Sequence, residues 1–370
     1  MHVQLRKPFF PEESIYRIQK QIKKVLNNGQ LTLGKNVLQF EKNFADYFSM
    51  KYAVAVSSAT AGLHLSLLAL NIKKLDEIIV PAKTFISTAN AALYCNAKPI
   101  FSDVNENSFQ IEPDEIEKMI TKKTKAIIPV HLGGNVCDMS KIKKIAKKNN
   151  LFIIEDAAHA HGSTYDGKFA GTLGDMGVFS FYPDKIMGSS DGGIIVTNNK
   201  NFYKKLLLLR NVGRKSIGQY NYTEIGYNYR MNEIQAIIAD EQLRLLPSMI
   251  KRRREIASLY NDEFNKLPNI QIQEIAKNVN SSYYAFIIKM KTGNLQKIRK
   301  KLEKQGIETS PMFYTVYKTQ AYRKLNRNFH PCKISEKLDK QTFSIPLHPG
   351  LSNKQIDFVI NTMKQYFSIF

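Results

Sequence analysis

Short apolar runs alternate with amphipathic stretches along the first 250 residues of the chain. The runs at residues 78–80 and 152–155 are short and rich in Ile, as in strands that are buried on both faces of a sheet. Between such runs, apolar residues recur every three to four positions, which is the helical period. Strands that alternate with helices predict an α/β domain built on a largely parallel sheet.

The same pattern gives approximate bounds for the elements. It predicts strands at residues 53–56, 78–80, 98–102, 126–130, 152–155, 178–181 and 194–196. It predicts helices at residues 12–28, 37–48, 60–70, 112–120, 141–149 and 202–211, and a longer one from residue 233. We expect this longer helix to end near Pro247, because proline disrupts a helix interior.

The pattern changes near residue 251. A basic helix at residues 251–267 leads into a strand at residues 285–290, and helices follow at residues 295–305 and near residues 354–367. This order is typical of an α+β unit. We therefore predict a large domain over residues 1–250, which includes the N-terminal helices, and a small C-terminal domain over residues 251–370.

A single lysine, Lys185, lies in the stretch GVFSFYPDKIMGSSDGG, at residues 177–193. Apolar runs flank it, and the glycines that follow it let another molecule approach the backbone closely. This setting suits a lysine that forms a Schiff base with a carbonyl compound. A solvated lysine on a turn is the alternative in a chain so rich in lysine, unless other stretches supply the rest of a site.

Other predicted strands also end in residues that suit a binding site. Ligands bind at the carboxyl ends of strands in such sheets, and there Asp156 follows a nearly all-apolar strand, with His159 three residues later. The hydroxyl-bearing joint at residues 57–60 precedes a helix, whose free N–H groups suit a phosphate. Phe85 follows another strand and suits stacking on a planar cofactor. An ordinary helix cap would explain Asp156 or the joint if either stood alone. It does not explain why such residues recur at the carboxyl ends of several predicted strands.

Composition narrows the partners and the compartment. The net charge of +22 invites a nucleic-acid partner, but the lysines lie on polar helix faces such as residues 141–150, without an Arg-rich arm, so we expect no such partner. No apolar run approaches the roughly 18 residues of a membrane span, and the first residues lack a secretory-signal pattern. Three widely spaced cysteines predict free thiols, no metal site and a reducing compartment. We therefore expect a cytoplasmic protein with no membrane partner.

Together these motifs resemble the DegT/StrS family of sugar-nucleotide aminotransferases, which use pyridoxal 5′-phosphate (PLP) in the aspartate-aminotransferase-like fold, fold type I. The resemblance covers nearly the whole chain and includes LTLGKNVLQFEKNFADYF, YAVAVSSATAGLHLSLLAL, IIEDAAHAHGSTYDGKFAGTLGDMGVFSFYPDK, GYNYRMNEIQA and SIPLHPGLS. It implies that the large domain binds PLP and has a mostly parallel seven-stranded sheet flanked by helices. It also implies a homodimer whose active sites are shared across the interface.

The resemblance implies catalytic roles for three residues. Lys185 would form the Schiff base with PLP and then carry a proton between the substrate and the cofactor. Asp156 would pair with the pyridine nitrogen and keep it protonated. His159 stands where the family has Gln, His or Glu near the face and the phenolic oxygen of the cofactor.

Cofactor and substrate contacts are implied in the same way. Phe85 would stack on the ring, the N–H groups of Ala59 and Thr60 would hold the phosphate together with Ser180, and Asn228 would reach a phosphate across the dimer interface. The candidates for substrate contact are Thr32, Lys83, Arg230, Tyr314 and Tyr317.

Four positions depart from the family pattern. Ala59 replaces the usual glycine of the phosphate loop, and Lys83 occupies a position that is more often uncharged. Tyr317 stands where many members have a histidine, and Asp191 where many have a glutamate. The last two departures bear on the identity of the sugar and on the position aminated, not on the cofactor chemistry.

These implications predict a PLP-dependent aminotransferase in which the cofactor alternates between PLP and pyridoxamine phosphate (PMP). L-Glutamate would give its amino group to a nucleotide-linked keto-deoxy sugar at C3 or C4, leaving 2-oxoglutarate, in amino-sugar biosynthesis for a bacterial surface glycan such as an O-antigen. One alternative is a sugar dehydratase of the same family, whose branch has histidine in place of Lys185. The others are a PLP-binding regulatory protein without turnover and a nucleic-acid-binding module.

Overall fold

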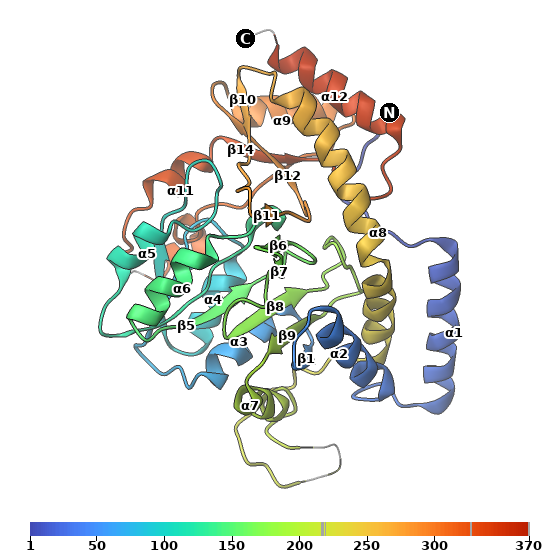
Figure 1. Cartoon of the computed structure of the whole chain (residues 1–370), viewed down its shortest axis with the longest axis vertical. Helices are drawn as coiled ribbons and strands as arrows, with labels where there is room; N and C mark the ends of the chain where they lie inside the picture. Colours follow the sequence, from blue (N-terminus) through green and yellow to red (C-terminus); the bar gives the residue numbers. More distant parts are fainter. Residues whose placement is uncertain (216–217, 219, 326–327, 369–370) are drawn as a thin grey trace.

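Two β-sheets joined by one long helix organise the computed structural model, which describes residues 1–215, 218, 220–325 and 328–368 (Figure 1). The large sheet has seven strands in the order β1-β9-β8-β5-β4-β2-β3. They are β1 (Tyr52–Val56), β9 (Gly193–Thr197), β8 (Met176–Ser180), β5 (Phe152–Asp156), β4 (Thr124–Ile127), β2 (Glu77–Pro81) and β3 (Lys98–Ser102). β9 is antiparallel to β1 and β8, and every pair from β8 to β3 is parallel. The predicted mostly parallel, seven-stranded sheet is confirmed.

The apolar strands are buried on both sides of this sheet. Successive side chains of a strand point to opposite faces. In β2, Ile79 belongs to the core cluster on one face, whereas Ile78 and Val80 belong to the cluster on the other. Ile153 and Ile154 of β5 divide in the same way, and all five side chains are buried. Burial on both faces accounts for the uninterrupted apolar runs in the sequence.

Helices cover both faces of the large sheet (Figure 1). The apolar residues of α2 (Lys35–Tyr47) and α6 (Met139–Lys148) belong to one core cluster, and those of α3 (Ala59–Ala69), α4 (Ile86–Tyr94) and α7 (Lys200–Arg210) to the other. On the first face, Phe44 and Phe48 pack against Phe179 of β8, with ring centroids 5.1 and 4.9 Å apart. This packing fixes the strand that leads toward Lys185.

A four-stranded antiparallel sheet forms the centre of the C-terminal part, in the order β10-β12-β14-β13. Its strands are β10 (Ile270–Ile272), β12 (Phe286–Met290), β14 (Thr342–Ile345) and β13 (Ser310–Pro311). The apolar residues of α9 (Leu295–Lys304) and α12 (Asn353–Phe367) belong to a third core cluster with this sheet. Val3 of the N-terminal arm joins the same cluster and forms a parallel bridge with Ile307. The first residues of the chain thus pack on its C-terminal part.

α8 (Glu233–Phe264) connects the two parts without a break, so the predicted helix end near Pro247 is wrong. A proline in a helix interior lacks the N–H donor and costs about 3 kcal/mol. The helix continues because buried side chains hold it on both sides of the proline, Leu246 before it and Ile250 after it. The predicted domain division after residue 250 falls within this helix and stays a prediction.

Short elements complete the described chain. A three-stranded sheet is formed by β11 (Val279–Asn280), β6 (Thr164–Tyr165) and β7 (Lys168–Phe169). The remaining elements are α1 (Glu12–Asn28), α5 (Pro113–Met119), η1 (Leu132–Gly134), η2 (Val316–Lys318), α10 (Gln320–Arg323) and α11 (Lys333–Leu338). Within the residues that the structure describes, no helix has both the length and the apolarity needed to cross a bilayer. The three cysteines are buried and free.

Replacing Pro247 by alanine should stabilise the protein. Pro247 is exposed, so alanine removes no core packing, and it restores one helix N–H and a better helix propensity. We expect the free energy of unfolding to rise by about 1–3 kcal/mol, measured by denaturant titration against Ser248→Ala as a matched exposed control. A loss of stability in Pro247→Ala alone would show that the long helix needs its proline.

Candidate active site

A cavity of about 480 Å³ lies at the carboxyl ends of the parallel strands, against the C-terminal part of the chain. Seven of the predicted catalytic and cofactor residues line it, namely Ala59, Thr60, Phe85, Asp156, His159, Ser180 and Lys185. They come from segments that are far apart in the sequence and that end at one edge of the sheet. The volume is within the range of cavities that bind cofactors and small substrates.

Lys185 lies in the connection between β8 and β9. Its N–H donates to the carbonyl of Tyr182 (2.9 Å), and the chain then passes so close to Pro183 that a side chain on Gly188 would meet the Pro183 carbonyl at 2.5 Å. The Nζ atom is 4.7 Å from the ring centroid of Tyr284. Burial lowers the pKa of Lys185 to about 8. Near physiological pH a minority of this amine, roughly one tenth to one fifth, is therefore neutral and nucleophilic, which is far more than for an ordinary lysine.

Asp156 ends β5 at the same edge and is buried. Oδ2 accepts a hydrogen bond from Thr88 Oγ1 (2.8 Å), and Oδ1 accepts one from the N–H of Ala158 (3.2 Å). Burial raises the pKa of this carboxyl group, and these two hydrogen bonds oppose the rise. A buried carboxylate at a cavity wall is stabilised by a cationic N–H group on a bound molecule.

The joint between β1 and α3 forms a cradle for an anion. Ser58 caps α3, and its hydroxyl accepts from the N–H of Ala61 (3.1 Å), so the helix begins with free N–H groups at Ala59 and Thr60. β9 passes directly behind this joint. A Cβ atom on Gly193 would lie 2.5 Å from the nitrogen of Ala59, so only glycine fits there.

Aromatic rings form the walls beside this cradle. His159 is stacked between Tyr284 and Phe313, with ring centroids 4.0 and 5.5 Å away and interplanar angles of 17° to each. Its Nδ1 accepts from the N–H of Gly133 (3.4 Å), which places the proton of a neutral ring on Nε2. Burial holds the pKa of His159 well below its usual value. Phe85 is 55% exposed, so its ring is available to a bound molecule.

The other predicted site residues do not line this cavity. Asn228 pairs with Asn211 in an isolated antiparallel bridge, and the Arg230 guanidinium donates to the side chain of Asn211 (3.0 Å). Thr32 is exposed at a bridge with Asn232.

Of the three remaining substrate candidates, Lys83 follows β2, and Tyr314 and Tyr317 follow β13. Lys83 is 1% exposed and donates to the carbonyl of Phe313 (2.8 Å) and to Asp339 Oδ1 (3.0 Å). Tyr317 is buried, and its hydroxyl donates to Glu336 (2.7 Å). Tyr314 is exposed next to Phe313. In this structure, Lys83 and Tyr317 contribute to internal packing.

Several residues that line the cavity were not predicted from the sequence. Arg6 reaches the cavity from the N-terminal arm, and Tyr284 and Phe313 reach it from the C-terminal part. No local pattern marks these three, because they meet the site only through the tertiary fold. Asp184 carried a signal, since it directly precedes Lys185 in the sequence.

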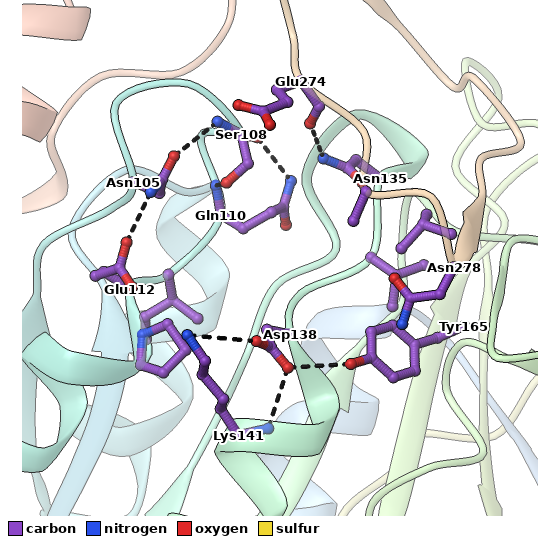
Figure 2. Close-up of a pocket in the computed structure, with 15 residues that line it drawn as sticks. Asn105, Ser108, Gln110, Glu112, Asn135, Asp138, Lys141, Tyr165, Glu274 and Asn278 are labelled. Carbon is purple, nitrogen blue, oxygen red and sulfur yellow. Dashed lines mark hydrogen bonds and ion pairs between the residues drawn. The ribbon is translucent and has the colours of Figure 1, made fainter.

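A second cavity, of about 350 Å³, differs in character (Figure 2). Its polar side chains mostly pair with one another: Tyr165 Oη donates to Asp138 (3.0 Å), Lys141 lies 3.8 Å from Asp138, and Asn135 donates to the carbonyl of Glu274 (2.9 Å). None of its lining residues is a cysteine, a histidine or an unpaired lysine. Among the described residues, no cluster of three or more His, Cys, Asp or Glu side chains is arranged to hold a metal ion. The first cavity is therefore the candidate active site.

Comparisons with known proteins find similar chains. A family model described as the DegT/DnrJ/EryC1/StrS aminotransferase family matches residues 13–364. GDP-perosamine synthase of Escherichia coli O157:H7 is 40% identical over 336 residues, which cover 90% of this chain and 91% of that protein. The dTDP-3-amino-3,6-dideoxy-α-D-galactopyranose transaminase of Aneurinibacillus thermoaerophilus is 36% identical over 352 residues, or 94% and 95% of the two chains.

Solved structures match over the full length as well. Spr1654 from Streptococcus pneumoniae in its PLP form superposes with a TM-score of 0.93 and 27% identity, over 100% of this chain and 99% of that chain. The same protein has also been solved in a PMP form.

Gly193→Ala should damage the anion cradle. The new Cβ atom would press on the backbone nitrogen of Ala59 at 2.5 Å and displace the start of α3. We expect affinity for the expected cofactor PLP to fall at least tenfold, which is about 1.4 kcal/mol, in an absorbance titration. Gly350→Ala, whose Cβ atom would meet only ordinary contacts of 3.4 Å or more, serves as control. Unchanged affinity in Gly193→Ala would mean that the cradle does not hold the phosphate.

Proposed function

The chain belongs to the DegT/DnrJ/EryC1/StrS aminotransferase family, and from that premise we propose that it moves the amino group of L-glutamate to C3 or C4 of a nucleotide-linked keto-deoxy sugar. It is a PLP-dependent sugar aminotransferase that acts on a sugar nucleotide. The donor, the position of amination and a bacterial surface glycan as the end product are the finer parts of the proposal. The observation that carries it is that Lys185, Asp156 and the start of α3 face one cavity.

The residues of this cavity fit the three reactive parts of PLP. The buried Asp156, whose carboxyl pKa is raised by burial, suits the protonated ring nitrogen. The N–H groups at the start of α3 suit the phosphate, with Ser180 on the adjacent wall of the cavity. Lys185, with its pKa lowered to about 8, suits the carbonyl carbon. The exposed Phe85 offers a flat surface for the ring, and His159 lines the same cavity with its ring stacked against Tyr284 and Phe313.

When bound, PLP supplies a ring that accepts the electrons left behind when the α-proton leaves the donor. Asp156 keeps a proton on the ring nitrogen, and Thr88 fixes the orientation of that carboxylate (2.8 Å). Lys185, as a neutral amine, would accept the α-proton of the donor, and it would supply a proton in the opposite direction when the sugar is the acceptor. Tyr284 and Phe313 cover His159 and exclude water from this region.

The relatives leave two sugar types open for the acceptor. One relative is named for GDP-perosamine and another for a dTDP-linked 3-amino sugar, so acceptors with GDP and dTDP and with C3 and C4 keto groups form the panel to test. The higher identity to the GDP-perosamine synthase makes GDP-linked sugars the first choice. The dehydratase alternative requires histidine at the position of Lys185, and lysine argues against it. A binding protein without turnover is opposed by the joint burial of Lys185 and Asp156 beside one cavity.

We also propose a homodimer in which Asn228 completes the neighbouring active site. Asn228 lies outside the cavity of its own chain. Apolar side chains near it face outward, since Ile225 is 91% exposed and Tyr222 is 52% exposed. A second copy of the chain would cover these side chains and bring Asn228 to a phosphate.

The first half-reaction tests the proposed function. The purified protein with PLP should show a visible absorbance band that L-glutamate converts to a near-ultraviolet band, with 2-oxoglutarate as product. Lys185→Ala should show neither change, because the amine that bonds the cofactor and carries the proton is missing. Each keto sugar nucleotide of the panel is then tested for return of the visible band. A wild-type protein that gains no band with PLP would refute the catalytic role of Lys185.

Mixed dimers test the role of Asn228. A dimer of one Lys185→Ala subunit and one Asn228→Ala subunit has one intact site and one doubly damaged site if Asn228 acts across the interface. We expect an equal mixture, dissociated and reassembled, to be well above either parent variant in sugar amination. Activity no higher than that of the parents would place Asn228 in its own subunit's site or outside catalysis.

A further inference from the structure

The N-terminal arm brings a second cation to the wall of the candidate active site. Arg6 lines the same cavity as Lys185, and its Nη1 forms an ion pair with Asp184 Oδ2 at 2.9 Å across 178 positions of sequence. The arm is anchored on both sides of Arg6, because the carbonyl of Leu5 accepts from the N–H of Leu347 before it and the carbonyl of Phe9 accepts from the side chain of Gln242 after it (2.9 Å). These contacts hold Arg6 in place against the cavity.

Asp184 is the group through which Arg6 reaches Lys185. Oδ2 of Asp184 accepts from Arg6 and also from the hydroxyl of Tyr284 (3.1 Å). Oδ1 is buried and has no hydrogen-bond partner among the described residues, and it lies 3.9 Å from Lys185 Nζ. This separation is longer than a hydrogen bond. The carboxylate is thus held beside the lysine at ion-pair distance, without a hydrogen bond to it.

A direct bond between Asp184 and Lys185 would oppose catalysis. An opposite charge within about 4–6 Å favours the charged form of an amine, whereas Lys185 has to be neutral to attack a carbonyl carbon or to accept a proton. The two residues are adjacent in the sequence and lie at one cavity wall. A positive charge that engages Asp184 is therefore needed, and Arg6 supplies it.

We propose that Arg6 is a positioning residue: its guanidinium keeps the carboxylate of Asp184 engaged and so leaves Lys185 available as a neutral amine. This inference rests on the proposed role of Lys185. Burial is the largest influence on Lys185 and lowers its pKa to about 8; Asp184 and Asp156 raise this pKa, and Arg6 lowers it. The other titratable groups that face Lys185 are His159, His161 and Tyr284.

Arg6→Met tests the proposal through two pH titrations. One follows the visible absorbance band of the PLP-loaded enzyme. The other follows acetylation of Lys185 in the cofactor-free protein by acetic anhydride, read by mass spectrometry of its peptide. Without Arg6, Asp184 acts on the lysine unopposed and favours the protonated form. Both midpoints should therefore rise by about one pH unit.

Three further variants separate this role from others. Lys7→Met removes an exposed positive charge from the next residue of the arm and should leave both midpoints unchanged. Arg6→Lys keeps a positive charge on the arm, so both midpoints should stay close to their wild-type values. In an Asp184→Asn background, Arg6→Met should shift the midpoints by less than half as much, because the carboxylate that Arg6 controls is absent.

Distinct results would overturn the proposal. Equal shifts in the two backgrounds would mean that Arg6 acts on Lys185 directly and not through Asp184. A loss of glutamate affinity without any shift in midpoint would make Arg6 a substrate contact. If the wild-type protein formed no band with PLP, the proposed function would fail, while the acetylation midpoints would still decide whether Arg6 controls Lys185.

Discussion

A carboxylate that is buried but only partly satisfied is the constraint on which the candidate site depends. β5 ends in two adjacent acidic residues on opposite faces of the strand. Glu155 accepts hydrogen bonds from the N–H groups of Gly171, Leu173 and Gly174 and lies 2.8 Å from His131, so its charge is fully compensated by the fold. Among the residues that the structure describes, the carboxylate of Asp156 accepts hydrogen bonds only from Thr88 and Ala158. Because an uncompensated buried charge is costly, Asp156 favours a bound molecule that carries a cationic N–H group.

The two sheets together create this low-dielectric setting. The large sheet supplies Asp156, Lys185 and the start of α3, and the C-terminal part closes the cavity with Tyr284 and Phe313. Removing water strengthens every charge interaction inside the cavity. The same burial that raises the pKa of Asp156 lowers that of Lys185. Burial thus acts on both groups: it makes a cationic partner favourable for the carboxylate of Asp156, and it favours the neutral amine of Lys185 that can attack a carbonyl carbon.

The sequence pattern predicted the features that depend on residues close together in the chain. The strand predicted at residues 98–102 matches β3. Asp156, Phe85 and the joint at residues 57–60 were placed at strand ends because parallel strands of one sheet end at a common edge, whereas Ser180 was named only through the family resemblance. The continuation of α8 through Pro247 was not predictable, because packing of Leu246 and Ile250 overrides a local breaker. Arg6 and Phe313 were missed for a related reason. Their contacts with the site span more than 100 positions, and no period in the chain reports such contacts.

Lys83 shows how tertiary structure gives an unusual residue its meaning. The family resemblance leads us to expect an uncharged residue at this position more often, and burial lowers the pKa of this lysine. The cost of burying the Lys83 ammonium group is offset by its hydrogen bonds to Asp339 and to the carbonyl of Phe313. Asp339 also accepts a hydrogen bond from the N–H of Thr315 (2.9 Å). Phe313 has a left-handed backbone with φ of 58°, a conformation that costs a bulky residue on the order of 1–3 kcal/mol. Lys83 and Asp339 therefore hold Phe313 in a strained conformation against His159 (5.5 Å) and Phe85 (5.7 Å). Lys83 thus acts, through Phe313, on the shape of the cavity wall beside His159 and Phe85.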